Sequence, residues 1–288
     1  MPFNNPPQKT QTLLITGCSS GIGYHAAHYF HQKGYHVIAS CRKSEDVERL
    51  QQEGLHCFQL DLADPEGLER NYLHILAATG GKIDILFNNA AFGLPGAVED
   101  LSREALKFQF ETNVFGTQHL TNLVIPTMRQ QGYGKILYNS SILGFAAMAY
   151  RGAYNASKFA IEGLADTLRL ELKDTDIEVI LIQPGPITSN FRQNAYQQFK
   201  HWIKLENSQH TQAYQAMIKR LSQEEKTAPF TLEPEAVTQA VEHAILHTPA
   251  KIRYPITLPT KVFAWLKRLL PNNWLDYLLL KAGGNGKR

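Results

Sequence analysis

An apolar run that stops at a glycine-rich turn limits most strongly what this chain can fold into. Residues 12–16 are apolar or β-branched, as in a buried strand, and residues 17–23 read Gly-Cys-Ser-Ser-Gly-Ile-Gly. Helical spacing of apolar residues follows and ends at Gly34. Backbone N–H groups at such a helix start bind phosphate, which glycine lets approach closely. The stretch predicts a nucleotide-binding unit, although its spacing differs from Gly-x-Gly-x-x-Gly and an ordinary surface turn is the alternative.

The rest of the chain alternates between strand-like and helical patterns. Further apolar runs of strand length lie at residues 37–40, 56–60, 83–87, 136–139, 177–182 and 252–256. Helical spacing separates them, most regularly over 65–78 and 103–131. The predicted fold class is therefore α/β, a single doubly wound Rossmann-type parallel sheet of about seven strands with helices on both faces.

We expect one domain with a lid and an appendage. No internal repeat or low-complexity tract divides the 288 residues, so residues 12–258 are assigned to the Rossmann-type domain. Residues 186–232 are long for a connection and rich in aromatic residues, which suits a substrate lid. The alternative is that these aromatic residues only pack the segment onto the body. Residues 259–288 form an amphipathic appendage that could cap the pocket, mediate a homodimer or make a peripheral membrane contact.

Composition favours a globular protein of a reducing compartment. A net charge of +3 is too small and too dispersed to indicate nucleic-acid binding. Cys18, Cys41 and Cys57 are odd in number and lack metal-ligand spacing, so we expect neither a disulfide nor a metal. The sequence shows no secretory signal and no uninterrupted apolar run long enough to cross a bilayer. We therefore expect a cytoplasmic protein.

Tyr154 and Lys158 are the strongest candidates for chemistry. Residues four apart share a helix face, and this pair stands at the predicted start of a helix that runs to about residue 172. A fixed positive charge beside a phenol favours the phenolate, which predicts a lowered pKa for Tyr154. Such a tyrosine could exchange a proton at physiological pH.

The Tyr-x-x-x-Lys spacing occurs twice more, at Tyr196 and at Tyr277, so the spacing alone does not identify a site. Only Tyr154 follows an apolar run that ends in paired serines and precedes a strand that ends in a Pro-Gly turn. We interpret the other two copies as surface pairs.

Polar residues at the ends of predicted strands indicate the kind of nucleotide. An acidic residue after the second strand would bind the ribose of NAD, but here that strand runs into Arg42. A guanidinium suits the 2′-phosphate of NADP, and a solvated basic turn is the alternative. Asp61 ends the third strand, where a carboxylate could meet the adenine. Asn113 interrupts an apolar helix pattern, and without other context a lone Asn there is more often a brace.

Taken together, these motifs resemble the short-chain dehydrogenase/reductase family. The shared motifs are Thr16-Gly17-x-x-x-Gly21-x-Gly23, Asn88-Asn89-Ala90, Asn113, Ser141, Tyr154-x-x-x-Lys158 and Pro184-Gly185. They extend over residues 12 to about 190, in the family's order. The branch that the chain resembles contains NADP-linked aldehyde reductases, retinol dehydrogenases and 17β-hydroxysteroid dehydrogenases.

The resemblance implies a role for each matching residue. The catalytic set is Tyr154 as general acid/base, Lys158 beside it, Ser141 on the substrate oxygen and Asn113 on a water chain. NADP would contact Gly17, Ser19, Ser20, Gly21, Ile22, Gly23, Arg42, Asp61, Leu62, Asn89, Ala90, Tyr154, Lys158, Pro184, Gly185, Ile187 and Thr188. Two positions depart from the family pattern. Ala91 replaces the usual glycine, and Ser20 stands where many NADP enzymes have a basic residue.

Two functions of different classes remain. One is an NADP(H)-dependent oxidoreductase for an aldehyde, ketone or alcohol on an apolar body, such as a medium- or long-chain aldehyde, a retinoid or a steroid. The other is a cofactor-binding regulator of the same fold with little or no turnover. The complete catalytic set favours the enzyme. A nucleotide-sugar epimerase is disfavoured, because its loop spacing is Gly-x-x-Gly-x-x-Gly.

Overall fold

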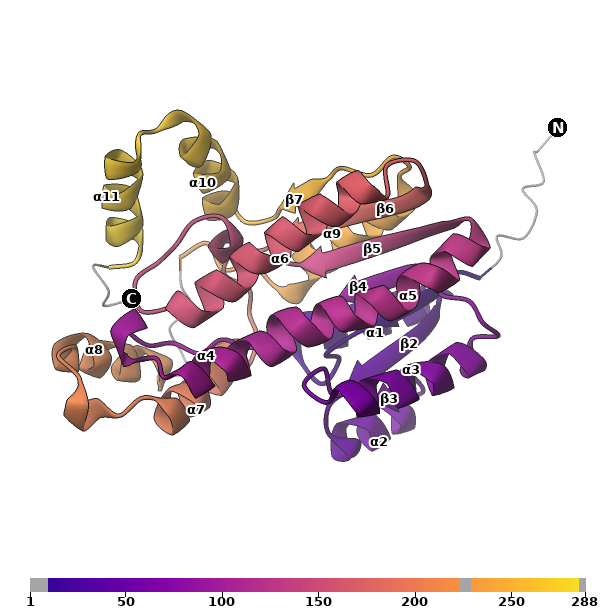
Figure 1. The fold of residues 1–288 in the computed structure, drawn as a ribbon, viewed down its shortest axis with the longest axis horizontal. Helices are drawn as coiled ribbons and strands as arrows, with labels where there is room; N and C mark the ends of the chain where they lie inside the picture. Colours follow the sequence, from indigo (N-terminus) through magenta and orange to yellow (C-terminus); the bar gives the residue numbers. More distant parts are fainter. Residues whose placement is uncertain (1–9, 223–228, 285–288) are drawn as a thin grey trace.

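The computed structural model describes residues 10–222 and 229–284, and it is built on one parallel sheet. The strand order is β3-β2-β1-β4-β5-β6-β7 (Figure 1). The strands are β1 (Thr12–Ile15), β2 (His36–Cys41), β3 (His56–Gln59), β4 (Ile85–Asn88), β5 (Tyr133–Asn139), β6 (Asp176–Gln183) and β7 (Arg253–Pro255). Each of the seven strand-like patterns corresponds to one of these strands.

Helices cover both faces of the sheet, because alternate strand side chains point to opposite sides. The main helices are α1 (Gly21–Gln32), α2 (Ser44–Gln52), α3 (Pro65–Ala78), α4 (Arg103–Phe110), α5 (Thr117–Gln131), α6 (Gly152–Glu171) and α9 (Pro234–Leu246). In β1, Leu13 and Ile15 pack in the core under α1, α2 and α9, whereas Leu14 packs under α3, α5 and α6. The predicted doubly wound fold is confirmed.

The predicted helix over 103–131 is not continuous. A π-helical turn, Glu111–Gly116, separates α4 from α5. A Cβ on Gly116 would lie 1.8 Å from the carbonyl oxygen of Leu62, so the close approach of the chain after β3 admits only glycine there. The wider turn leaves Phe115 exposed while Asn113 is buried. Such π-bulges are frequent at functional sites.

Residues 186–232 leave the sheet and return beside their own starting point. The Leu232 N–H donates to the Pro186 oxygen at 3.1 Å, and the Thr188 N–H donates to the Leu232 oxygen at 2.9 Å. The excursion contains α7 (Phe191–Trp202), a 3-10 turn (Leu205–Asn207) and α8 (Thr211–Leu221). Buried side chains of α7 and α8 pack on the body through Phe199, Tyr214, Met217 and Leu221. Much of the aromatic content of the segment therefore serves packing.

Two C-terminal helices, α10 (Leu258–Leu269) and α11 (Asn272–Ala282), lie side by side at one end of the molecule (Figure 1, yellow). The two helices pack against Ile142 and Leu143, which follow β5, through the buried side chains of Phe263, Leu275 and Leu279. The C-terminal helices are therefore part of the packed structure. Across the described ranges, no helix combines the length and the apolar character needed to cross a membrane.

Candidate active site

Tyr154 and Lys158 lie on the first two turns of α6, beside the end of β5. Lys158 is 3% exposed, and its ammonium donates a hydrogen bond of 2.6 Å to the carbonyl oxygen of Asn139, the last residue of β5. The Lys158 nitrogen lies 5.6 Å from the centre of the Tyr154 ring. The helix start is thereby joined to the carboxyl edge of the sheet, where nucleotide-binding folds hold their ligands.

The two surface copies of the Tyr-x-x-x-Lys pattern have similar ring-to-ammonium geometry. The distance is 4.8 Å for Tyr196 on α7 and 4.6 Å for Tyr277 on α11. Their partners Lys200 and Lys281 are exposed, however, whereas Lys158 is buried. Burial and the strand-end contact distinguish Tyr154, and the helical spacing does not.

The prediction of a lowered pKa for Tyr154 is wrong for this structure. Removal of water from around the phenol raises its pKa to about 12 and outweighs Ser141 and Arg151, which both favour the phenolate. Burial lowers the pKa of Lys158 to about 8, although the nearby Glu162 acts in the opposite direction. Helical spacing indicates the neighbouring positive charge, but it does not indicate that the phenol is desolvated.

Ser141 lies two residues beyond the end of β5 and faces the tyrosine. Its Oγ accepts a hydrogen bond of 3.1 Å from the Leu143 N–H, and the residue is 8% exposed. This bond occupies a lone pair of the oxygen and leaves the hydroxyl hydrogen able to donate elsewhere. The serine hydroxyl also favours the Tyr154 phenolate, so the two hydroxyl groups lie close together.

Asn113 reaches the same region from the π-helical turn. Its side-chain nitrogen donates to Phe92 O at 3.0 Å and to Ser157 Oγ at 3.1 Å, and its oxygen accepts from the Phe92 N–H at 3.2 Å. It also lines a small polar pocket with Asn88, Asn139 and Lys158. Within the described residues, the side-chain oxygens of Asn88 and Asn139 are buried without a hydrogen-bond partner. Asn113 is therefore both a brace and part of the polar surroundings of the lysine.

The glycine-rich turn is held by the residues that follow β4. The backbone N–H groups of Asn89 and Ala90 donate to Thr16 Oγ1 at 3.0 and 2.9 Å. The Asn89 amide donates to the Thr16 and Gly17 carbonyl oxygens at 2.9 and 3.2 Å. A Cβ on Gly23 would lie 2.3 Å from Gly17 O, so the turn and the helix fit only without a side chain there. The cradle thus has the shape that a phosphate site requires.

The remaining turn residues lie next to this cradle. Ser20 precedes α1 with extended backbone, and Ile22 packs into the core below. Gly21 has φ +58°, in the left-handed region that favours glycine. Ser19 points its carbonyl oxygen at Arg49 of α2, whose guanidinium donates to it at 2.8 Å. Arg49 was not predicted from the sequence, because only the fold brings α2 to this turn.

Arg42 stands at the end of β2, and its side chain is exposed. Gln59 fixes its backbone by donating to the Arg42 oxygen at 3.0 Å. Arg49, in contrast, pairs with Asp46 at 2.9 Å and with Glu53 at 3.3 Å. Its charge is thus largely matched by carboxylates in α2 and at its C-terminal end, which leaves Arg42 as the better-placed cation for an additional phosphate.

The two predicted adenine residues follow β3. The Asp61 carboxylate accepts from the Ala63 N–H at 2.9 Å, which orders the turn and leaves its second oxygen unassigned. Leu62 is buried and its carbonyl oxygen faces Gly116. Both residues lie at the carboxyl edge of the sheet, as predicted.

The predicted nicotinamide end is the chain that leaves β6. Pro184 O accepts from the Ile142 N–H at 2.8 Å, next to Ser141. A Cβ on Gly185 would lie 2.1 Å from Thr257 Oγ1, so this glycine allows α10 to approach. Ile187 pairs with Leu232, and the Thr188 hydroxyl donates to Glu233 at 2.9 Å. These residues form a wall beside the catalytic candidates.

Arg151, which lies beside Tyr154, and two further arginines that interact with Arg151 were also missed. Arg151 precedes Tyr154 by one helical turn, whereas Arg192 and Arg220 come from α7 and α8. Burial, together with the charges of the other two guanidinium groups, lowers the pKa of Arg220 to about 9. The sequence does not predict that these arginines lie together, because only the fold of residues 186–232 brings them together.

Phe191 is the aromatic residue of the proposed lid that touches the site, with its ring centre 5.3 Å from that of Tyr154. It is 36% exposed and fills the space above Gly93, where a Cβ would lie 2.6 Å from the ring. Phe191 is therefore positioned to contact whatever binds beside the tyrosine.

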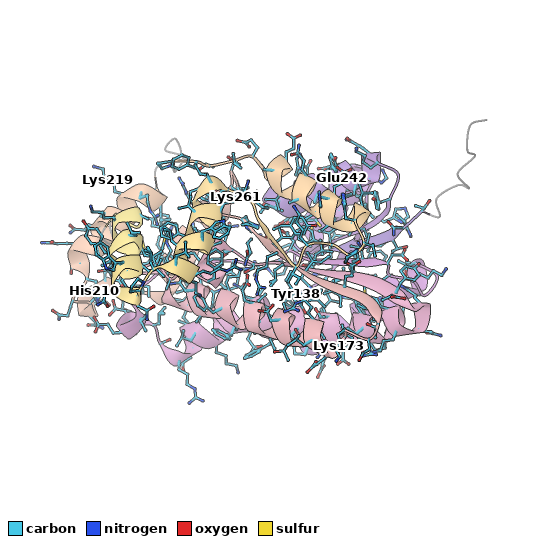
Figure 2. All side chains as sticks on the ribbon, turned by 90° about the horizontal axis from the view of Figure 1, so that it is seen from above. Tyr138, Lys173, His210, Lys219, Glu242 and Lys261 are labelled. Atoms are coloured by element: carbon cyan, nitrogen blue, oxygen red, sulfur yellow. The ribbon has the colours of Figure 1, made fainter. Side chains whose placement is uncertain are left out.

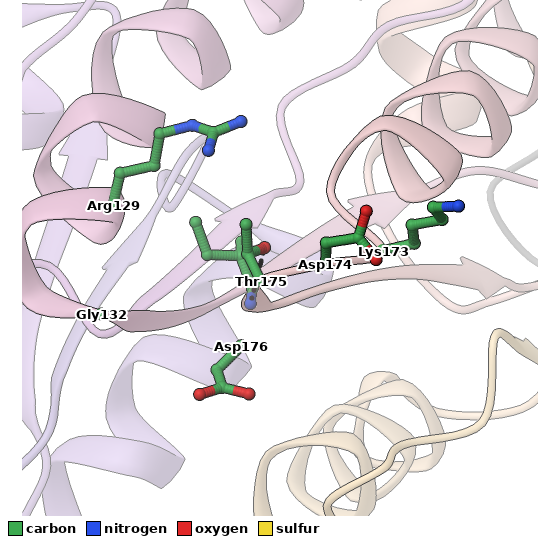
Figure 3. Close-up of a pocket in the computed structure, with 7 residues that line it drawn as sticks. Arg129, Gly132, Lys173, Asp174, Thr175 and Asp176 are labelled. Carbon is green, nitrogen blue, oxygen red and sulfur yellow. Dashed lines mark hydrogen bonds between the residues drawn. The ribbon is translucent and has the colours of Figure 1, made fainter.

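A larger depression, of about 390 Å³, lies at the opposite edge of the sheet. Figure 3 shows it where β5 and β6 begin, with Arg129, Lys173, Asp174 and Asp176 among its lining residues. This edge carries the amino ends of the parallel strands, away from every predicted site residue. The residues predicted for catalysis and cofactor binding lie at the carboxyl edge instead.

The fold and this arrangement define a nucleotide-dependent oxidoreductase. Residues 11–200 match the family model described as short chain dehydrogenase, and the chain belongs to that family, whose fold binds a nicotinamide cofactor. It is 40% identical over 269 residues to the uncharacterized oxidoreductase YbbO of Escherichia coli K12, covering 93% of this chain and 94% of that protein. It is 37% identical over 191 residues to human retinol dehydrogenase 8, covering 63% and 60%.

Solved structures show the same fold with either cofactor. A short-chain dehydrogenase from Streptomyces avermitilis aligns with a TM-score of 0.76 at 24% identity, over 98% of this chain and 99% of that one. An enzyme from Burkholderia phymatum in complex with NAD has a TM-score of 0.73 at 21% identity, over 90% and 92%. A serine dehydrogenase complexed with NADP+ has a TM-score of 0.72 at 25% identity, over 87% and 96%. The fold alone therefore does not choose between NAD and NADP.

Proposed function

We propose that this protein is an NADP(H)-dependent oxidoreductase that transfers a hydride between the nicotinamide and a carbonyl or alcohol carbon on an apolar substrate. The substrate classes are medium- or long-chain aldehydes, retinoids and steroid-like ketones or alcohols. The observation that carries the proposal is the gathering of Tyr154, Ser141 and the buried Lys158 at the carboxyl edge of the sheet, beside the glycine-rich cradle.

When bound, the nicotinamide supplies or accepts the hydride. In the reductive direction, negative charge develops on the substrate oxygen, where Ser141 donates its hydroxyl hydrogen and Tyr154 delivers a proton. The raised pKa of Tyr154 means that this phenol holds its proton at neutral pH, as an acid must. The proton is therefore available until the substrate oxygen becomes basic enough to take it.

Lys158 is suited to restore that proton. Its pKa of about 8 allows it to gain and lose a proton near neutrality. The buried amide oxygens of Asn88 and Asn139 lack hydrogen-bond partners within the described chain, so they are acceptors available to a relay that includes Asn113. The same lysine would hold the ribose next to the nicotinamide.

The preference for NADP is supported by Arg42. Its exposed guanidinium follows β2, and that strand end carries no carboxylate to receive a ribose hydroxyl. An apolar substrate is supported by Phe191 beside Tyr154 and by Phe145, Met148 and Leu266, which pack in the same cluster as the tyrosine.

The proposal is tested by a substrate panel monitored through NADPH absorbance. Aldehydes of increasing chain length, retinal and a steroid ketone are compared at equal concentration. Each buried methylene contributes about 0.8 kcal/mol, so kcat/KM should rise about fourfold per methylene until the pocket is full. Equal efficiency for acetaldehyde and a medium-chain aldehyde would exclude the apolar pocket. NADPH binding without turnover of any substrate would support the regulator instead.

A further inference from the structure

The C-terminal helices expose an apolar stripe that no described element covers. On α10, the side chains of Leu258, Val262, Trp265 and Leu269 follow a spacing of four, three and four residues, which places them on one helix face. Their exposed fractions run from 43% at Val262 to 71% at Leu269. The same helix buries Phe263 on its other side. This helix is thus apolar towards the protein and towards solvent.

The second helix of the pair continues the surface. On α11, Trp274, Tyr277 and Leu280 are 65%, 52% and 50% exposed. Leu275 and Leu279 of α11 pack inward in the same cluster as Phe263 of α10, so the two helices form one packed unit. Contiguous exposed apolar surface of this kind marks an interaction site.

The helices that carry this apolar surface contain more cations than carboxylates. The segment from Leu258 to Ala282 carries Lys261, Lys267, Arg268 and Lys281 and a single carboxylate, Asp276. Lys267 lies over the Phe159 ring of α6 at 5.1 Å, and Lys261 projects from α10 (Figure 2). The combined charge attracts a negative partner and opposes the approach of a second, identical surface.

We propose that α10 and α11 dock the protein on the surface of a bilayer that contains anionic lipids. Tryptophan and tyrosine prefer the interface between headgroups and acyl chains, and the flanking cations meet the lipid phosphates. Exposed Leu258 and Leu269 at the two ends of α10 enter the apolar boundary below. The helices lie in the interface and do not cross it.

This docking brings the candidate active site to the membrane. Tyr154 packs in the same cluster as Phe263, Leu275 and Leu279, so the tyrosine lies against the inner side of the docking helices. An apolar substrate dissolved in the bilayer would then reach the site through a short path. The docking goes beyond the proposed function and stands without it, because it depends on surface chemistry alone.

Flotation of the full-length protein with vesicles tests the proposal. Vesicles of equal parts phosphatidylglycerol and phosphatidylcholine should carry the protein, and vesicles of phosphatidylcholine alone should carry much less. The Trp265→Ser/Trp274→Ser variant should lose at least about tenfold in partitioning, whereas Leu170→Ser/Leu246→Ser, at two equally exposed leucines elsewhere, should bind like the parent. In the Lys261→Gln/Arg268→Gln variant, each lost cation should reduce binding about fivefold.

A second measurement does not depend on any variant. Brominated lipids should quench the fluorescence of Trp265 and Trp274. The fluorescence of the half-buried Trp202 should remain. A parent protein that stays unbound to anionic vesicles overturns the proposal, as does equal binding by the tryptophan and leucine variants. A dimer in solution that dissociates on Trp265→Ser/Trp274→Ser, without vesicle binding by the parent, would assign the surface to self-association and also overturn it.

Discussion

The Lys158 ammonium and the Asn139 carbonyl oxygen form a 2.6 Å hydrogen bond that joins α6 to the last residue of β5. The bond fixes the lysine where helix and sheet meet, next to the Tyr154 phenol and the polar pocket that Asn113 lines. A buried ammonium needs such partners, because burying an unpaired charge is costly. The same contact that completes the packing therefore also orients the candidate site.

Replacement of Tyr154 by Phe should abolish most of the turnover. The change removes the transferable proton and keeps the ring that packs beside Phe191. We expect kcat to fall by about 10² to 10⁴ with little change in NADPH affinity. Steady-state kinetics and cofactor fluorescence measure the two quantities. Tyr196→Phe and Tyr277→Phe serve as matched controls and should keep most of the activity. A Tyr154→Phe enzyme with parental turnover would remove the phenol from the mechanism.

Lys158 should make the folded state more stable as the pH rises above about 8. Its pKa falls from 10.5 to about 8 on folding, so between these values the unfolded chain holds more protons than the native one. The free energy of unfolding should therefore rise by up to about 1.4 kcal/mol per pH unit in this window, and the gain is lost as the pH falls through about 8.

Urea denaturation at several pH values between these limits measures this rise. Lys158→Met removes the titrating group and keeps a side chain of similar length, so its unfolding free energy should rise less steeply with pH. Identical slopes for the parent and the variant would show that the lysine keeps an ordinary pKa.

Arg42→Ala should weaken NADPH binding and leave NADH binding almost unchanged. A charge-assisted contact with the 2′-phosphate contributes about 1.5 to 3 kcal/mol, which corresponds to roughly one to two decades in the dissociation constant. Titration of cofactor fluorescence with both nucleotides gives the comparison. Lys43→Ala is the control, because Lys43 already pairs with Glu45 at 2.8 Å. Equal dissociation constants for NADPH and NADH in the parent would contradict the assignment.

Gly23→Ala should disturb the nucleotide cradle. The added Cβ would lie 2.3 Å from Gly17 O and 2.6 Å from the Asn89 amide nitrogen, so the turn has to shift. We expect cofactor affinity to fall at least about tenfold, and thermal stability to fall as well. Gly163→Ala is the matched control within α6, where no atom lies within 4 Å of the new Cβ. That change should stabilise the protein by about 1 kcal/mol. Unaltered cofactor binding in Gly23→Ala would show that the turn does not form the cradle.

The sequence alone was sufficient to predict the strands and a parallel sheet with helices on both faces. β-branched apolar runs such as Thr12–Ile15 and the helical spacing of Pro65–Ala78 are short-range patterns, and the structure has elements at these places. The left-handed backbone of Gly17 and Gly21 is also local, since it depends on a missing side chain. Parallel strands then bring the loop ends to one edge, which is why the scattered motifs could be expected to meet.

Only the tertiary structure decided the properties that depend on burial and on distant neighbours. The π-helical turn that contains Asn113 ends at Gly116, which lies against Leu62, a residue far away in the sequence. The raised pKa of Tyr154 follows from the loss of water around the phenol, which helical spacing does not report. Arg220 and the C-terminal helices reach the site through folding of the last third of the chain. Periodicity encodes local conformation, whereas desolvation and long-range packing are set by what the completed fold brings together.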